Sequence, residues 1–194
     1  HALLMKLSGF DGAVIDWYGT STLHDYATVA SNTAAFIPYL KKAGLRFAIC
    51  YEDQSVRELV KARKEVDSLA QGRLDVAWLD KSCFSDDAYL RIDGRPALLM
   101  FGPQHFVTNQ FRALFEGLAH PPLVFGLPHL ARDHGCDGAF GWPPVSEGKK
   151  VAPDEWRREL GTLYARQASG EPVIAPAFPG FHDIYQQAGL HNSY

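Results

Sequence analysis

Six short apolar runs, separated by longer polar stretches, most constrain the fold that this 194-residue chain can adopt. Each run is nearly continuous in hydrophobicity, a pattern typical of strands that are buried on both faces of a parallel sheet. The runs cover residues 13–17, 45–52, 96–101, 123–127, 138–142 and 173–178. Hydrophobic residues make up 46% of the chain, which is enough to build a sizeable core around such strands.

The stretches between the runs have the hydrophobic period of amphipathic helices. Helices are expected at residues 25–43, 55–70, 108–118 and 154–168. The first of them ends at Gly44, a residue type that commonly ends helices, and the last begins with Pro153 followed by Asp154 and Glu155. Regular alternation of strands and helices predicts successive βα units and a parallel sheet.

Two local patterns support this reading. The sequence Gly-x-Asp-Gly-Ala occurs at residues 9–13 and again at 135–139, each time directly before an apolar run. The connection between residues 54 and 95 is longer than the others and holds a second helical piece around residues 74–83. In that connection, the Asp93-Gly94 pair predicts a hairpin turn ahead of the strand at residues 96–101.

We therefore predict an α/β fold of the (β/α)8 TIM-barrel type. The chain shows about six βα units, and a complete barrel has eight strands. We expect residues 1–194 to form a single β/α-barrel domain that is truncated at both ends. The alternative is an open α/β sheet.

Composition and motifs exclude several classes of function. The net charge is −3 and Lys and Arg are scattered, so no nucleic-acid partner is expected. No apolar run reaches the roughly 18–20 residues of a membrane span. The three cysteines show no CxxC spacing, the histidines show no HxH or HxxxH spacing, and GxGxxG, GxxxxGK and GxSxG are absent. We expect neither a bound metal nor another cofactor.

Polar residues gather at the ends of the predicted strands, where the active sites of βα proteins lie. Asp16 and Glu52 end two neighbouring strands. If Glu52 faces the barrel interior, alternation turns Cys50 and Ala48 inward with it. Asp16 should also face inward, because an unpaired carboxylate against the helices would cost several kcal/mol. Two carboxylates in one cleft can differ in pKa and divide acid and base work. Asp53 is a third candidate for catalysis, although it points away from Glu52 on an extended backbone and is also placed to cap the next helix.

Aromatic and hydrogen-bonding side chains at the strand ends favour a carbohydrate ligand, because aromatic rings can stack on the apolar faces of sugars. The candidate substrate-binding residues are Trp17, Tyr18, Tyr51, Gln104, His129, Trp142, Phe178 and His182.

Three segments resemble the glycoside hydrolase family 99-like and family 71-like barrels. They are GFDGAVIDWYG at residues 9–19, AGLRFAICYE at 43–52 and YLRIDGRPALLM at 89–100. These families include endo-α-mannosidases and α-1,3-glucanases, and the resemblance implies polysaccharide degradation by a secreted or periplasmic protein. It also implies that Glu52 is the active-site glutamate at the end of its strand. Asp53 and Gln54 stand where the endo-mannosidase group has Pro and Tyr.

The sequence thus predicts a glycoside hydrolase that cleaves an α-linked oligosaccharide or polysaccharide by carboxylate acid/base catalysis. One alternative is a carbohydrate-binding barrel without catalytic activity. Another is an unrelated βα-barrel enzyme that acts on a small metabolite.

Overall fold

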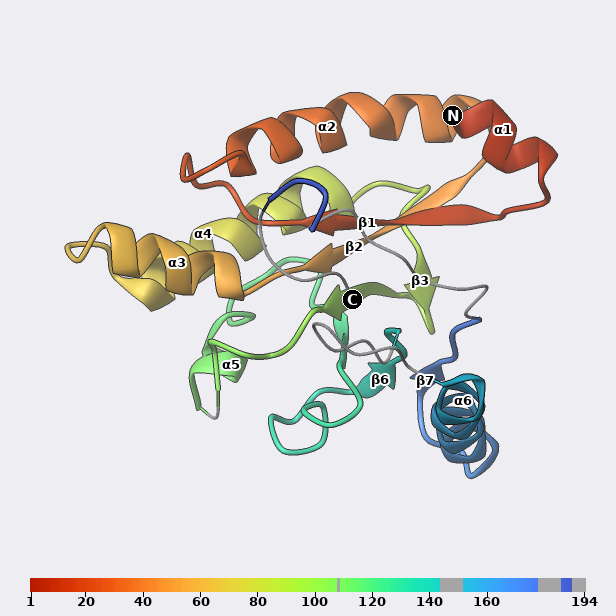
Figure 1. Ribbon diagram of the computed structural model, residues 1–194. Coiled ribbons are helices and arrows are strands. Elements are labelled where there is room, and N and C mark those ends of the chain that lie inside the picture. Colours follow the sequence, from red (N-terminus) through yellow and green to blue (C-terminus); the bar gives the residue numbers. More distant parts are fainter. Residues whose placement is uncertain (108, 144–151, 178–185, 190–194) are drawn as a thin grey trace.

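The computed structural model describes residues 1–107, 109–143, 152–177 and 186–189. Six parallel strands form one curled sheet, and their order in the sheet follows their order in the chain. They are β1 (Gly12–Trp17), β2 (Arg46–Tyr51), β4 (Arg95–Met100), β5 (Leu123–Gly126), β6 (Gly138–Phe140) and β7 (Val173–Ile174). The short strand β3 (Arg91–Ile92) pairs antiparallel with β4 (Figure 1).

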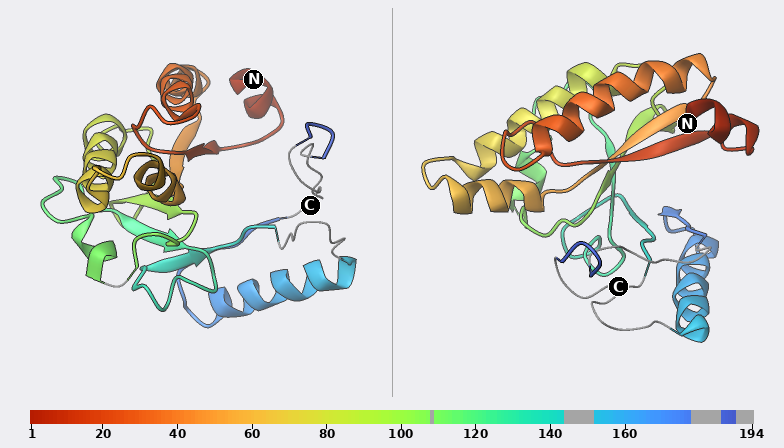
Figure 2. Two further views of the ribbon diagram at one scale, coloured as in Figure 1. Left: turned by 60° about the vertical axis from the view of Figure 1, so that its left-hand side comes forward. Right: turned by 45° about the horizontal axis from the view of Figure 1, so that its top comes forward.

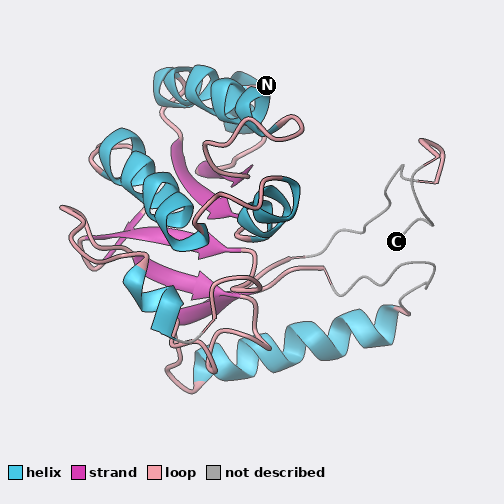
Figure 3. Cartoon of the chain, turned by 90° about the vertical axis from the view of Figure 1, so that its left-hand side faces the viewer, coloured by secondary structure: helices cyan, strands magenta, loops and turns pink. Residues whose placement is uncertain are grey.

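One helix precedes the first strand and the others come after strands, and the helices lie along the outer side of the curled sheet, as Figures 2 and 3 show. They are α1 (Ala2–Leu7), α2 (Tyr26–Lys42), α3 (Gln54–Ala62), α4 (Ser68–Leu79), α5 (Asn109–Ala113) and α6 (Pro153–Ala168). A π-helical turn, η1 (Asp80–Phe84), continues α4. The mixed α/β class and the parallel sheet are confirmed, in the form of a half-barrel of six strands.

The hairpin predicted ahead of β4 is confirmed. Asp93 and Gly94 connect β3 to β4 with φ values of 49° and 78°, the left-handed conformations that tight hairpin turns require. The repeated Gly-x-Asp-Gly-Ala motif also has a structural counterpart. Gly9 and Gly135 both adopt positive φ directly before β1 and β6, so each lets the chain reverse into the following strand.

Two expected helices differ from the structure. The helix expected at residues 55–70 is divided into α3 and the start of α4, because Arg63 leaves the helical conformation and Asp67 starts a new helix. The Asp67 side chain accepts a hydrogen bond from the Ala70 N–H at 2.6 Å, which caps α4. The helix expected at 108–118 is the short α5, followed by a turn.

The register of β1 and β2 determines which side chains share a face. Asp16 lies opposite Cys50, and Trp17 lies opposite Tyr51. Tyr51 points to the helices, because its hydroxyl donates a hydrogen bond to Asp75 of α4 at 2.8 Å. Asp16 and Cys50 therefore face the concave side, as the alternation argument predicted.

Aromatic packing joins the sheet to its outer helices. The Trp17 ring stacks on Trp78 of α4 with a centroid distance of 5.2 Å and contacts the Tyr51 ring at 5.7 Å. Trp17 and Tyr51 are completely buried. None of the described helices has both the length and the apolar character needed to cross a bilayer.

Candidate active site

Asp16 and Glu52 lie at the carboxyl ends of β1 and β2, and on the concave side of the sheet their carboxylates are close enough to interact electrostatically. The Glu52 N–H donates to the Trp17 carbonyl at 2.9 Å, which continues the β1–β2 pairing one step past the strands. Glu52 consequently lies two residues beyond Cys50, the residue that pairs with Asp16. The two carboxylates are diagonal neighbours on one face.

Burial and mutual repulsion control the protonation of this pair. Burial is the main cause that raises the pKa of Glu52 from 4.5 to about 7, and the negative charges of Asp16 and Asp53 raise it further. Burial also raises the pKa of Asp16, but hydrogen bonds from the Tyr18 side chain and the Trp17 backbone counteract it. Glu52 is therefore the carboxyl of this pair with a pKa of about 7, near neutral pH.

The two carboxylate oxygens of Asp16 differ in their hydrogen bonding. Its Oδ2 accepts a hydrogen bond from the Tyr18 hydroxyl at 3.1 Å. Its Oδ1 is buried and has no hydrogen-bond partner among the described residues. A buried carboxylate oxygen without a donor adds to the cost of ionising this side chain.

Asp53 has a different environment, although it follows Glu52 directly. Its carboxylate is completely buried and accepts hydrogen bonds from the backbone N–H groups of Gln104, His105 and Phe106, at 2.7–3.1 Å. Burial raises the pKa of Asp53, and the three N–H groups counteract it. Asp53 thus holds the loop that follows β4 and does not cap α3 with its side chain.

The predicted substrate-binding residues divide between the two sides of the sheet. Trp17 and Tyr51 lie on the outer side against α4, away from the carboxylates, because the register turns them toward the helices. Tyr18 lies beside Asp16. Trp142 follows β6, is 39% exposed and packs edge-on against Phe101, with ring centroids 4.7 Å apart.

The remaining candidates lie farther from the pair. Gln104 folds back on its own loop, since its Nε2 donates to the Phe101 carbonyl at 3.2 Å. His129 is exposed in the turn after β5, which is two strands away from β2 in the sheet. Phe178 and His182 lie outside the described residues.

Sequence reasoning missed two side-chain groups that support the loops around the pair. Asp75 of α4 accepts hydrogen bonds from Thr20 in the loop after β1. Ser68 Oγ lies 2.6 Å from His105 Nε2 in the loop after β4. These contacts join residues 37 to 55 positions apart, so no local pattern in the sequence reveals them.

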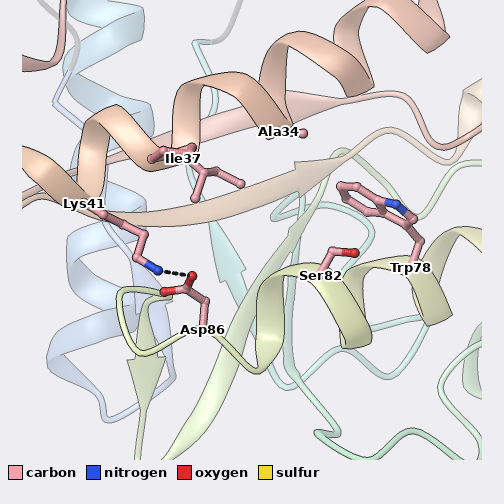
Figure 4. Close-up of a pocket in the computed structure, with 7 residues that line it drawn as sticks. Ala34, Ile37, Lys41, Trp78, Ser82 and Asp86 are labelled. Carbon is pink, nitrogen blue, oxygen red and sulfur yellow. Dashed lines mark hydrogen bonds and ion pairs between the residues drawn. The ribbon is translucent and has the colours of Figure 1, made fainter.

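A cavity of about 420 Å³ lies elsewhere in the molecule, between α2 and the α4–η1 helix (Figure 4). Ile37, Trp78 and Ser82 contribute to its lining, and an ion pair between Lys41 and Asp86, 2.6 Å long, lies at one end. These helices cover the outer side of the sheet, so the cavity is separate from the carboxylate pair. Among the residues that the structure describes, no group of three His, Cys, Asp or Glu side chains is arranged to hold a metal ion.

Comparison with known proteins gives a likeness in fold. No family model matches the chain, and no curated protein matches it. A solved structure described as "Glycoside hydrolase-like protein" is similar over 100% of this chain, with a TM-score of 0.67 and 12% sequence identity. The chain spans 65% of the length of that structure's chain, less than two thirds. At this identity the similarity shows the fold alone, and it is consistent with part of a TIM-type barrel.

Proposed function

We propose that the chain is the catalytic barrel of a glycoside hydrolase that cleaves an α-linked glycan. Glu52 is the general acid that protonates the glycosidic oxygen, and Asp16 is the ionised carboxylate beside it. The sequence resemblance to the family 99-like and 71-like barrels supports the α-linked substrate class. The fold-level similarity to a glycoside hydrolase-like protein is consistent with it.

The observation that carries this proposal is the placement of two partly buried carboxylates at the ends of neighbouring strands, where burial and mutual repulsion raise the pKa of Glu52. A pKa of about 7 keeps part of the Glu52 population protonated at neutral pH, as a general acid requires. Burial raises the pKa of Asp16, and the hydrogen bond that the Tyr18 hydroxyl donates counteracts this and favours the ionised form. Such a pair supplies both the acid and the anionic group that glycoside hydrolysis needs.

An aromatic side chain after β6 fits a sugar ligand. The exposed ring of Trp142, held by Phe101, offers an apolar surface on which a sugar ring can stack.

The test compares the wild-type protein with Glu52→Gln on α-mannan and α-1,3-glucan, and measures newly formed reducing ends. The amide keeps the shape of the side chain but cannot donate the acid proton, so we expect turnover to fall by roughly a hundredfold or more. Glu65→Gln, at an exposed position between α3 and α4, is the matched control and retains full turnover.

Unchanged turnover in Glu52→Gln would remove Glu52 from the mechanism. If the wild-type protein binds these glycans without cleaving them, the chain is a carbohydrate-binding barrel and the catalytic proposal is wrong. If cleavage occurs, the anomer formed first distinguishes retention from inversion, which require carboxyl separations of about 5 Å and roughly 6.5–9.5 Å.

A further inference from the structure

A buried carboxylate on the outer side of the sheet lies close behind the candidate active site. Asp75 of α4 is 1% exposed. Its Oδ1 accepts hydrogen bonds from the Thr20 N–H at 2.8 Å, the Thr20 hydroxyl at 2.7 Å and the Gln71 amide at 3.0 Å. Its Oδ2 accepts one from the Tyr51 hydroxyl at 2.8 Å.

All four of these donors are neutral groups, so hydrogen bonds alone compensate the burial of this carboxylate. Burial raises the pKa of Asp75, and the donors from Thr20, Tyr51 and Gln71 counteract it. A buried carboxylate without such donors is strongly unfavourable, which means that the loop carrying Thr20 is bound tightly to α4.

The same loop is pressed against Asp75 at Gly19. This glycine has a φ of +89°, and a Cβ atom added to it would lie 2.6 Å from Asp75 Oδ2. Only glycine combines that backbone conformation with so close an approach. Asp75 therefore determines where residues 19 and 20 lie at the end of β1.

Tyr18 immediately precedes this anchored pair of residues. Its hydroxyl donates to Asp16 at 3.1 Å, and its ring stacks on Tyr26 at the start of α2 with a centroid distance of 5.3 Å. The direction of the Tyr18 side chain thus depends on the backbone that follows it, and Asp75 holds that backbone at Gly19 and Thr20.

We propose that Asp75 is a positioning residue: by holding Gly19 and Thr20, it directs the Tyr18 hydroxyl onto Asp16 and so favours the ionised form of that carboxyl beside Glu52. The contacts stand independently of any reaction, while the catalytic consequence rests on the proposed glycoside hydrolase function.

Other groups also act on the carboxylate pair, and the test must separate their effects. Glu52 and the Cys50 thiol of β2 share the concave face with Asp16. On the other flank, Asp53 and the Tyr26 hydroxyl of α2 interact electrostatically with Glu52. None of these four groups is bonded to Asp75 in the described contacts, so substitutions at position 75 leave them in place.

The experiment is a titration of the Asp16 and Glu52 carboxyl carbons by NMR in the full chain, which needs no substrate. Tyr18→Phe removes the hydrogen bond to Asp16 directly, and Asp75→Ala removes the anchor of the loop. We expect the titration midpoint of Asp16 to move to higher pH in both variants, and by a smaller amount in Asp75→Ala, where loss of a negative charge acts in the opposite direction. Loss of the negative charge at position 75 without loss of positioning would move it to lower pH, so the sign separates the two causes.

Asp75→Asn is the conservative variant, because its amide oxygen can still accept from Thr20 while its NH2 group faces the Tyr51 hydroxyl. Because the loop stays anchored and only the negative charge is lost, we expect the Asp16 midpoint to show no upward shift and to lie at or slightly below the wild-type value. Tyr51→Phe, which removes a partner of Asp75 but no bond to the loop, leaves the midpoint unchanged. If Asp75→Ala does not fold, Thr20→Val, which loses one of the two loop bonds, is expected to produce a smaller shift in the same direction.

On an α-glycan that the protein cleaves, we expect Asp75→Ala to lower kcat by roughly tenfold with little change in KM. A tenfold decrease corresponds to the loss of one hydrogen bond to a charged group. Asp75→Asn stays within about twofold of wild type. An unchanged Asp16 midpoint in Asp75→Ala, or a shift to lower pH, overturns the proposal. If the wild-type protein cleaves no glycan, the proposed function fails, and the NMR titration still decides the role of Asp75.

Discussion

At the scale of single residues, the environment of a carboxylate determines its chemistry more than its type does. Glu52, Asp16 and Asp53 all lie near the carboxyl ends of β1 and β2. Glu52 is half-buried beside two negative charges and has a pKa of about 7. Asp16 receives a hydroxyl donor, and Asp53 receives three backbone N–H groups. Three carboxylates of similar reactivity in solution thus become a candidate acid, its anionic partner and a loop anchor.

The raised pKa of Glu52 leads to a prediction about stability. The unfolded chain ionises Glu52 near pH 4.5 and the folded chain near pH 7, so the folded state retains a proton that the unfolded state releases. The contribution of Glu52 to stability is therefore complete below about pH 4.5 and is lost as the pH rises to 7. We expect the melting temperature of Glu52→Gln, relative to wild type, to increase between pH 4.5 and pH 8, as measured by calorimetry. A difference that does not depend on pH would contradict the pKa assignment, and Glu65→Gln provides the baseline.

At the scale of elements, two loops at the carboxyl end of the sheet are held by buried carboxylates from other elements. Asp75 of α4 holds the loop after β1, and Asp53, next to α3, holds the loop after β4. The bond between Ser68 and His105 connects the second loop to α4 as well. Loops built this way present their side chains in a defined orientation, which candidate binding groups such as Tyr18 and Gln104 require.

Replacing Asp53 with alanine tests this arrangement at the loop after β4. The backbone N–H groups of Gln104, His105 and Phe106 would lose their acceptor together, so we expect a loss of roughly 3 kcal/mol or more in the free energy of unfolding. Urea denaturation measures the loss, and hydrogen exchange should accelerate at these three amides. Asp67→Ala removes a cap that accepts from one N–H and should cost only about 1 kcal/mol. Unchanged exchange at all three amides in Asp53→Ala would show that Asp53 does not hold the loop.

At the scale of the whole molecule, helices cover the outer face of the half-barrel, and large apolar side chains are exposed near its β1 edge. The sheet is joined to α4 by the buried stack of Trp17 and Trp78. At the β1 edge, Val14 is 54% exposed, and on the neighbouring α1 Leu3 and Leu7 are 70% and 83% exposed. Large apolar side chains that are exposed to solvent, such as those of α1, promote association.

Because these side chains are exposed, substitutions on α1 should be able to change self-association without changing the stability of the fold. Leu7→Lys places a charge where no packing is lost, so the melting temperature should change little and self-association at high protein concentration should decrease. Ala2→Lys, on the same helix but 6% exposed, should lower the melting temperature clearly, because a charge would be forced into the core. Calorimetry and analytical ultracentrifugation measure the two effects. Equal destabilisation by both substitutions would show that α1 packs differently.

The architecture and the carboxylate pair were accessible from the sequence because they depend on local periodicity. Continuous apolar runs predicted six buried strands, helical spacing predicted the helices between them, and period-two alternation placed Asp16 and Glu52 on one face. The Asp93-Gly94 hairpin followed from turn chemistry in the same way.

What only the tertiary structure decided depends on residues far apart in the chain. Trp17 and Tyr51 were expected to bind substrate, but their register turns them toward α4. Asp53 was expected at the catalytic site, but its partners lie more than fifty residues away, in the loop after β4. By itself the sequence determined which residues form strands and which end them, because those preferences act over a few neighbours. The hydrogen-bond partners that assign each carboxylate its role exist only once the strands and helices have packed together.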